Sequence, residues 1–192
     1  VTMFSATMSR AVMDISWIYQ RDVVELKVEP EAEDKPLIDQ FSIEVSSQRR
    51  IETVIKLLNK FNYKKVMIFC NRKHITDYVA RRLTAAGIKA ASIHGDVQQS
   101  AREKTLSQFR RGSLQVLVAT DVAARGIDVE GVDAVINYDI PDENEYYIHR
   151  IGRTGRARTE GAAYTFTTLM TQPKLDEIMR YTRCEIKPLV LD

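Results

Sequence analysis

Short apolar runs that alternate with helix-period segments constrain the fold of this chain more than any other feature. From residue 63 onward the runs are apolar on both faces, and they read Lys65–Cys70, Lys89–His94, Gln115–Ala119 and Asp133–Asn137. A strand that is apolar on both faces has to be covered on both sides, so these runs predict a buried, mostly parallel sheet. The segments between them, 73–86, 98–111 and roughly 142–151, have helical periodicity. The sequence therefore predicts an α/β fold in which right-handed crossovers place helices on both faces of a central sheet.

Further elements flank this alternation. An amphipathic helix is expected over Arg49–Phe61, a late strand over Gly161–Thr168 and a last helix over Pro173–Arg183. Gly87 and Gly112 follow two of the helical segments and are typical of helix ends. Upstream stands a separate piece, with a helix predicted over about 8–20 and a strand over 23–28. The acidic, proline-bounded stretch 29–36 between the two parts is typical of a linker.

The composition is that of an ordinary soluble domain. The 192 residues carry a net charge of +2, which alone indicates no nucleic-acid partner, and no apolar run is long enough to cross a membrane. Cys70 and Cys184 have neither disulfide nor metal-ligand spacing, which favours a reducing, cytoplasmic location. The three histidines are scattered along the chain, so no metal site is expected in it.

One octet is strongly basic: residues 149–156 read His-Arg-Ile-Gly-Arg-Thr-Gly-Arg. Its arginines, Arg150, Arg153 and Arg156, recur every third residue with glycines between them. A guanidinium is a planar fork that binds phosphate oxygens two at a time, and glycine lets a backbone come close to a ligand. The octet therefore indicates a polyphosphate site, although a solvated basic helix end would have the same composition.

The loops after the predicted strands are the other candidate sites, because ligands of such sheets gather outside the carboxyl ends of the strands. After the strand 115–119 come Thr120 and Asp121, and then Asp128. Thr120 could donate to a phosphate oxygen and Asp128 could accept from a ribose hydroxyl. The alternative is that Thr120 or Asp121 only caps the next turn.

Two more loops carry basic or small residues at the same edge. Gly95 allows close backbone approach, and Gln99 and Arg102 share one face near the start of the following helix. Because helix N-termini attract anions, Arg102 could meet a nucleic-acid phosphate, or it could pair with Glu103 in solvent. The strand 65–70 delivers Asn71 and Arg72 to the same edge.

Together these motifs resemble the carboxy-terminal half of a DEAD-box RNA helicase. The resemblance runs from residue 1 to about 170, in the family's order and spacing. It rests on Ser5-Ala6-Thr7, Ile68-Phe69-Cys70-Asn71, His94-Gly95-Asp96 with Gln99-x-x-Arg102, Thr120-Asp121 through Ala124-Arg125-Gly126-Ile127-Asp128, Tyr138-Asp139-Ile140-Pro141, and the basic octet. One departure is Arg72, where the family often has Thr.

The resemblance implies a three-layer RecA-like fold of the P-loop NTPase type, and it implies roles for individual residues. Arg153 and Arg156 resemble arginine fingers that reach the γ-phosphate of ATP. His149 resembles the residue that links the two lobes, and Asp128, with Gly126, resembles the ribose and nucleotide contact. Ser5 and Thr7 resemble the motif that couples hydrolysis to unwinding. The RNA-facing set, directed at phosphates and sugars, would be Asn71, Arg72, Gly95, Gln99, Arg102, Thr120 and Asp121.

The domain organisation follows from the same resemblance. Residues 1–28 would be a remnant of a preceding RecA-like domain, 29–37 an interdomain linker, and 38–192 the helicase C-terminal RecA-like domain. The chain begins at Val1 inside a motif, so we expect it to be a fragment.

The resemblance also sets what such a fragment can do. ATP would be held with Mg²⁺ whose ligands lie on the missing first lobe. RNA and that lobe would be the partners, and the chain alone would hydrolyse no ATP. With the sheet they would cover absent, residues 1–28 would pack on their own domain or on a second copy, giving a possible tail-mediated dimer. A non-catalytic RNA-binding or docking module and a DNA helicase lobe are the alternatives.

Overall fold

The computed structural model describes residues 10–19, 37–125, 127–129, 131–155 and 160–191. The chain divides into two compact units, Val1–Lys35 and Pro36–Asp192. In the first unit the described element is α1 (Arg10–Tyr19), which agrees with the helix predicted over 8–20. The strand predicted over 23–28 lies outside the described residues, as does most of the predicted linker.

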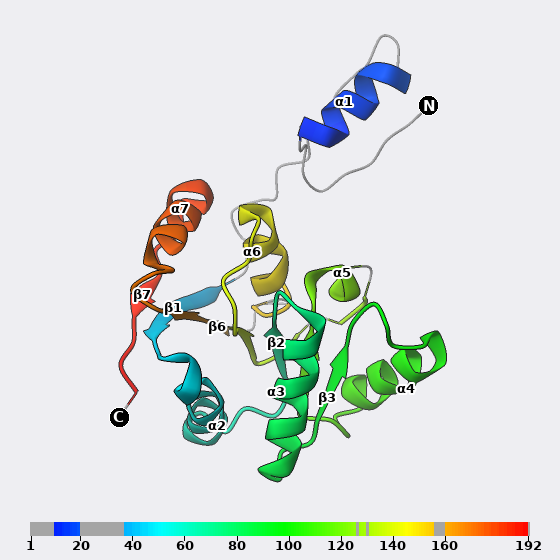
Figure 1. Cartoon of the computed structure of the whole chain (residues 1–192), viewed down its shortest axis with the longest axis vertical. Coiled ribbons are helices and arrows are strands. Elements are labelled where there is room, and N and C mark those ends of the chain that lie inside the picture. The colour runs from blue at the N-terminus through cyan, green and yellow to red at the C-terminus, as the bar shows by residue number, and fades with distance from the viewer. Residues whose placement is uncertain (1–9, 20–36, 126, 130, 156–159, 192) are drawn as a thin grey trace. The chain divides into compact units, whose positions relative to one another are not determined.

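The second unit is built on a seven-stranded sheet with the order β3-β4-β2-β5-β6-β1-β7. Every printed pairing between neighbouring strands is parallel. The strands are β1 (Ile38–Glu44), β2 (Val66–Phe69), β3 (Ala90–Ile93), β4 (Val116–Ala119), β5 (Ala134–Asn137), β6 (Gly161–Thr167) and β7 (Lys187–Pro188). The strands run through the middle of this unit in Figure 1, and helices surround them.

Helices cover both faces of the sheet, which confirms the predicted three-layer α/β architecture. The helices of this unit are α2 (Arg50–Lys60), α3 (Lys73–Ala85), α4 (Gln99–Arg110), α5 (Asp121–Ala124), α6 (Asn144–Ile151) and α7 (Gln172–Thr182), with a 3₁₀ turn η2 (Ser47–Arg49) before α2. Helices α2 and α3 pack with one set of strand side chains. Helices α4 and α5 pack against the opposite face, and so do α6 and α7, since Val135 and Ala163 beneath them are register partners.

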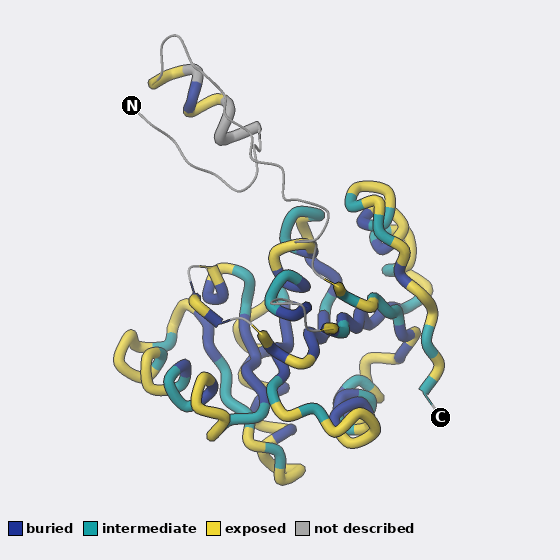
Figure 2. The backbone as a smooth tube through the Cα atoms, turned by 180° about the vertical axis from the view of Figure 1, so that it is seen from behind, coloured by how far each residue is buried: buried dark blue, intermediate teal, exposed yellow. Residues whose placement is uncertain are grey.

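The central strands are apolar throughout because both of their faces are covered. All residues of β2, β4 and β5 are buried, and Figure 2 shows the buried backbone concentrated along these strands. Alternate residues of β2 point to opposite faces, so Ile68 belongs to the core under α2 and α3 and Met67 to the core under α4 and α5. The predicted helix ends are also confirmed: α3 and α4 stop two residues before Gly87 and Gly112, which have φ of 83° and 73°.

Strand β1 was not predicted from the sequence, which indicates no element over residues 38–44. It pairs with β6 over seven register positions, from Ile38↔Gly161 to Glu44↔Thr167. The strand lies near the sheet edge and mixes buried with exposed residues, so it lacks the continuous apolar run of the central strands. On its other side the two-residue β7 closes the sheet, and Leu189 N donates to Ser42 O at 2.8 Å.

Candidate functional site

The loops that follow the strands bring the predicted site residues to one edge of the sheet. Parallel strands end at the same edge, and β3, β4, β2 and β5 are consecutive neighbours. Gly95 follows β3, Thr120 follows β4 and Asn71 follows β2, although these residues are far apart in the sequence. The carboxyl edge of the sheet is therefore the candidate site.

A buried arginine, Arg150, links the loops after β2, β4 and β5 at this edge. Its residue is 1% exposed. It forms a two-pronged ion pair with Asp121, with Nε to Oδ1 at 2.6 Å and NH2 to Oδ2 at 2.6 Å. NH2 also donates to Asn71 Oδ1 at 2.8 Å, NH1 donates to the carbonyl of Asp139 at 2.7 Å, and the guanidinium lies 5.3 Å from the ring of Phe69. Arg150 thus ties α6 to the ends of β2, β4 and β5.

This placement corrects the sequence analysis, which put Arg150 with the phosphate-binding arginines. A guanidinium that is buried and saturated by protein acceptors is not free to receive a polyphosphate. The helical spacing of Arg150 with Tyr147 and Ile151 is the sequence signal that indicates its burial. These three residues form the buried face of α6, while Ile148 and His149 are exposed.

The remaining described part of the octet borders a small cavity. His149 and Arg153 line a volume of about 220 Å³ together with Asp121, Arg125 and Tyr146. Arg153 is half-buried, and it donates from NH1 to Ile127 O at 2.7 Å and from NH2 to Ala124 O at 3.3 Å. The guanidinium of Arg125 lies 5.6 Å from the Tyr146 ring. The cavity therefore combines cationic donors with an aromatic wall.

Of the other predicted nucleotide contacts, the structure describes Asp128. Asp128 is exposed, and its main-chain oxygen accepts from Arg110 Nε at 3.0 Å. Gly126 and Arg156 lie outside the described residues, and so do Ser5 and Thr7.

In the loops after β3 and β4, Gly95 is exposed whereas Thr120 and Asp121 are partly buried, and α4 is hydrogen-bonded to α5. Thr120 caps α5, accepting from Ala123 N at 3.4 Å, so the capping interpretation holds, and a hydroxyl that accepts one bond can still donate another. Arg102 NH2 donates to Ala123 O at 2.6 Å, so it does not pair with Glu103. Instead Glu103 accepts from the exposed Gln99 at 2.7 Å.

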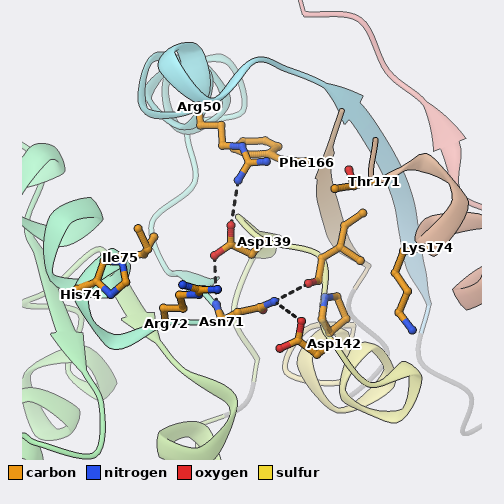
Figure 3. Close-up of a pocket in the computed structure, with 12 residues that line it drawn as sticks. Arg50, Asn71, Arg72, His74, Ile75, Asp139, Asp142, Phe166, Thr171 and Lys174 are labelled. Atoms are coloured by element: carbon orange, nitrogen blue, oxygen red, sulfur yellow. Dashed lines mark hydrogen bonds and ion pairs between the residues drawn. The ribbon is translucent and has the colours of Figure 1, made fainter. Parts of the chain in front are cut away.

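Asn71 is held in place by protein groups on all sides, as Figure 3 shows. Its main-chain N donates to Asp139 Oδ2 at 3.1 Å, and its side-chain Nδ2 donates to Ile140 O at 2.8 Å and to Asp142 Oδ1 at 3.1 Å. Arg72, the next residue, is exposed. Asn71 therefore fixes the course of the loop from which Arg72 projects.

Ionisation at this edge follows burial and pairing. Burial raises the pKa of the Cys70 thiol, next to Asn71, well above its ordinary value, so this cysteine stays protonated near neutral pH. Burial also raises the pKa of Tyr138 to about 12. A hydrogen bond from Lys73 at 2.6 Å lowers the pKa of Asp96 and joins the loop after β2 to the loop after β3.

No group of three His, Cys, Asp or Glu side chains among the described residues gathers closely enough to hold a metal ion. No helix in the described ranges is both long and apolar enough to cross a membrane.

Comparison with known proteins decides the family. The profile of the helicase conserved C-terminal domain matches residues 49–158, which is more than half of the chain. The chain belongs to the DEAD-box helicase family and carries its C-terminal helicase domain. In this DEAD-box chain the matched region contains Asn71, Gly95, Arg102, Thr120 and Arg153, so the edge described above lies inside the family domain.

Several DEAD-box relatives resemble the chain over nearly its whole length. An ATP-dependent RNA helicase FAL1 of Kluyveromyces lactis is 39% identical over 189 residues, covering 98% of this chain and 48% of the relative. An ATP-dependent RNA helicase eIF4A of Yarrowia lipolytica is 39% identical over 185 residues, covering 96% and 47%. The chain thus spans about half the length of the curated relatives it matches.

Solved structures of DEAD-box proteins share the fold of this chain. A DEAD box protein from Methanococcus jannaschii superposes with a TM-score of 0.76 at 38% identity, over 97% of this chain and 50% of that one. Saccharomyces cerevisiae Dbp5 bound to RNA and ADP BeF3 gives a TM-score of 0.84 at 28% identity, over 97% and 50%. These likenesses confirm the predicted RecA-like fold of the DEAD-box C-terminal domain.

Proposed function

We propose that this chain is the carboxy-terminal lobe of an ATP-dependent RNA helicase and completes an ATP site held mainly by a first lobe. The observation that carries the proposal is the Arg150 ion pair, because it fixes two groups of residues at one edge. His149 and Arg153, beside Arg150 on the chain, belong to one group, and Asn71 and Asp121, with the neighbouring Thr120, belong to the other. Such a shared anchor suits a protein in which nucleotide and RNA act together.

On the nucleotide side, Arg153 and Arg156 act as arginine fingers on the γ-phosphate of ATP bound to the first lobe. Arg153 is now bonded to main-chain oxygens, which a phosphate would replace with stronger, charge-assisted bonds. Asp128, beside Gly126, accepts from the ribose, and His149 contacts the first lobe. Acids of the first lobe would hold Mg²⁺, which would supply charge neutralisation on the phosphates, while this chain supplies and orients the fingers.

On the RNA side, the chain binds the sugar-phosphate backbone without reading sequence. Gly95, Gln99, Arg102 and Thr120 offer backbone, amide, guanidinium and hydroxyl groups from adjoining loops, and Arg72 adds a charge. Asn71 and Asp121 belong to the same set but act by positioning, since Arg150 engages their side chains. Closure of the two lobes would bend one strand away from its partner, and Ser5 and Thr7 would couple that step to hydrolysis.

The chain alone is expected to hydrolyse no ATP. Its sequence contains neither a Gly-x-x-x-x-Gly-Lys-Ser/Thr loop nor an Asp-Glu-Ala-Asp motif, so fingers have no bound triphosphate to act on. An arginine finger contributes about 10³–10⁵ in rate only when the rest of the site is present.

ATPase measurements on the chain alone and joined to a DEAD-box first lobe test this directly. We expect RNA-stimulated turnover only in the joined protein, and we expect Arg153→Ala to lower it by about 10³ or more. Magnesium-dependent turnover by the chain alone would contradict the expectation. A joined protein that binds RNA but never turns over would favour the non-catalytic module, and equal stimulation by DNA would favour a DNA helicase lobe. The proposed location is the cytoplasm.

A further inference from the structure

A second, larger cavity lies at the same sheet edge, beyond Asn71. It has a volume of about 680 Å³ and opens between the loops after β2, β5 and β6 and the start of α2. Figure 3 shows His74 and Ile75 on one side of it, Thr171 and Lys174 on the opposite side, and Arg50 above Asp139. Its volume is in the range of small-ligand sites, which is enough for one nucleotide.

The cavity continues the RNA-facing edge in the order of the sheet. The residues proposed to bind RNA follow β3, β4 and β2, whereas the cavity walls follow β2, β5 and β6, the next strands in line. Asn71 and Arg72 belong to both. An RNA strand that lies along the first three loops would therefore reach the cavity within one or two spacings between neighbouring β-strands, each about 4.8 Å.

The charges lining the cavity favour an anion. Its two carboxylates are already engaged, since Asp139 accepts from Arg50 NH1 at 2.9 Å and from Asn71 N, and Asp142 accepts from Asn71. Arg72 is exposed, and Lys174 pairs with Glu177 of its own helix at 3.2 Å, a surface pair of small strength. The lining thus carries three cationic side chains, Arg50, Arg72 and Lys174, against the two carboxylates.

The walls also suit a nucleobase. The imidazole of His74 is exposed, and Ile75 and Pro141 add apolar surface beside it. Unstacked bases bind against aromatic rings and guanidinium planes, which His74 and Arg72 supply.

We propose that this cavity is a subsite for one additional RNA nucleotide, whose phosphate binds Arg72 and whose base stacks in the space beside His74. The subsite rests on the proposed RNA role of the edge and extends it. Arg72 is also the position at which the chain departs from the family, where Thr is common, so the subsite is a property of this chain. Lys174 supports it from the opposite wall.

Titration of the ¹⁵N-labelled chain with single-stranded oligouridylates, lengthened one nucleotide at a time at either end, tests the subsite. Short RNA should shift the amide signals of Gly95 and Thr120. One added nucleotide should then shift those of His74 and Lys174 and raise the affinity about fivefold. Arg72→Thr should abolish that increase and reduce the slope of log affinity against log salt by about 0.7. His74→Ala should weaken the increase while leaving the slope unchanged.

The matched control is Arg111→Thr, which removes an exposed arginine where α4 ends, away from the carboxyl edge, and should keep the fivefold increase. If Gly95 and Thr120 respond while His74 and Lys174 stay unmoved at every length, the subsite is wrong and the RNA role of the edge stands. If no amide signal responds to any RNA, both the subsite and the proposed RNA role of the edge are wrong. An equal loss of affinity in Arg72→Thr and Arg111→Thr would reduce the effect to general charge and overturn the subsite.

Discussion

At the scale of single residues, Arg150 has the greatest influence on this domain. It is buried, and its partners lie in the loops after β2, β4 and β5. Its removal leaves the carboxylate of Asp121, with a side chain 17% exposed, without its ion-pair partner. Removing one partner of such a buried pair typically costs 3–5 kcal/mol, because the other charge stays unpaired.

We therefore expect Arg150→Met to lower the free energy of unfolding by about 3 kcal/mol in urea titrations. Asp121→Leu should cost a similar amount, and the double variant should cost less than the sum of the two. Arg111→Met, at an exposed position, should stay within about 0.5 kcal/mol of the parent. A loss below about 1 kcal/mol for Arg150→Met would show that the pair contributes little net stability.

At the scale of elements, the sequence predicted the central strands to within about a residue at each end, because two-sided burial leaves a continuous apolar run. It missed β1, whose edge position permits polar residues, and β7, which is two residues long. For the site, it located the correct edge of the sheet, since topology alone places the loops there. Helical spacing with Tyr147 and Ile151 indicates that Arg150 turns inward, but its ion-pair partner, Asp121, lies 29 residues away and could not be identified from the sequence.

Gly155 lies in the turn after α6, where the described part of the basic octet ends, and packs closely against the start of β1. Gly155 has a φ of 66°, and a Cβ added there would lie 2.5 Å from Ile38 Cγ1 and 2.8 Å from the main-chain oxygen of Leu37. Gly155→Ala should therefore destabilise the domain by about 2–4 kcal/mol, through both backbone strain and overlap with β1. Gly112→Ala is the matched control, since its φ is 73° but nothing lies within 4 Å, and it should cost about 1 kcal/mol. Equal unfolding midpoints for the two variants would refute the role of close packing.

At the scale of the whole molecule, the described part of α1 exposes apolar side chains. Ile15, Ile18 and Tyr19 are 47%, 72% and 66% exposed. We propose that this segment is covered in solution by a second copy of the chain. Light scattering after size exclusion should give a dimer that Ile18→Glu and Tyr19→Lys dissociate. Replacement of the exposed Val122 on α5 by Glu, as a control, should not dissociate it. A monomer whose first 35 residues are cleaved rapidly by protease would contradict this arrangement.

The Arg150 anchor also has a consequence in time. Asn71 precedes Arg150 by 79 residues. During synthesis, the loop after β2 is therefore made well before the arginine that binds it. At about 5–20 residues per second, that delay is roughly 4–16 s. During it the strands β2, β3 and β4 can form, and Arg102 can already bond to Ala123, but the loop after β2 lacks its bond to α6. The ligand-facing edge can therefore be completed only after α6 has been synthesised.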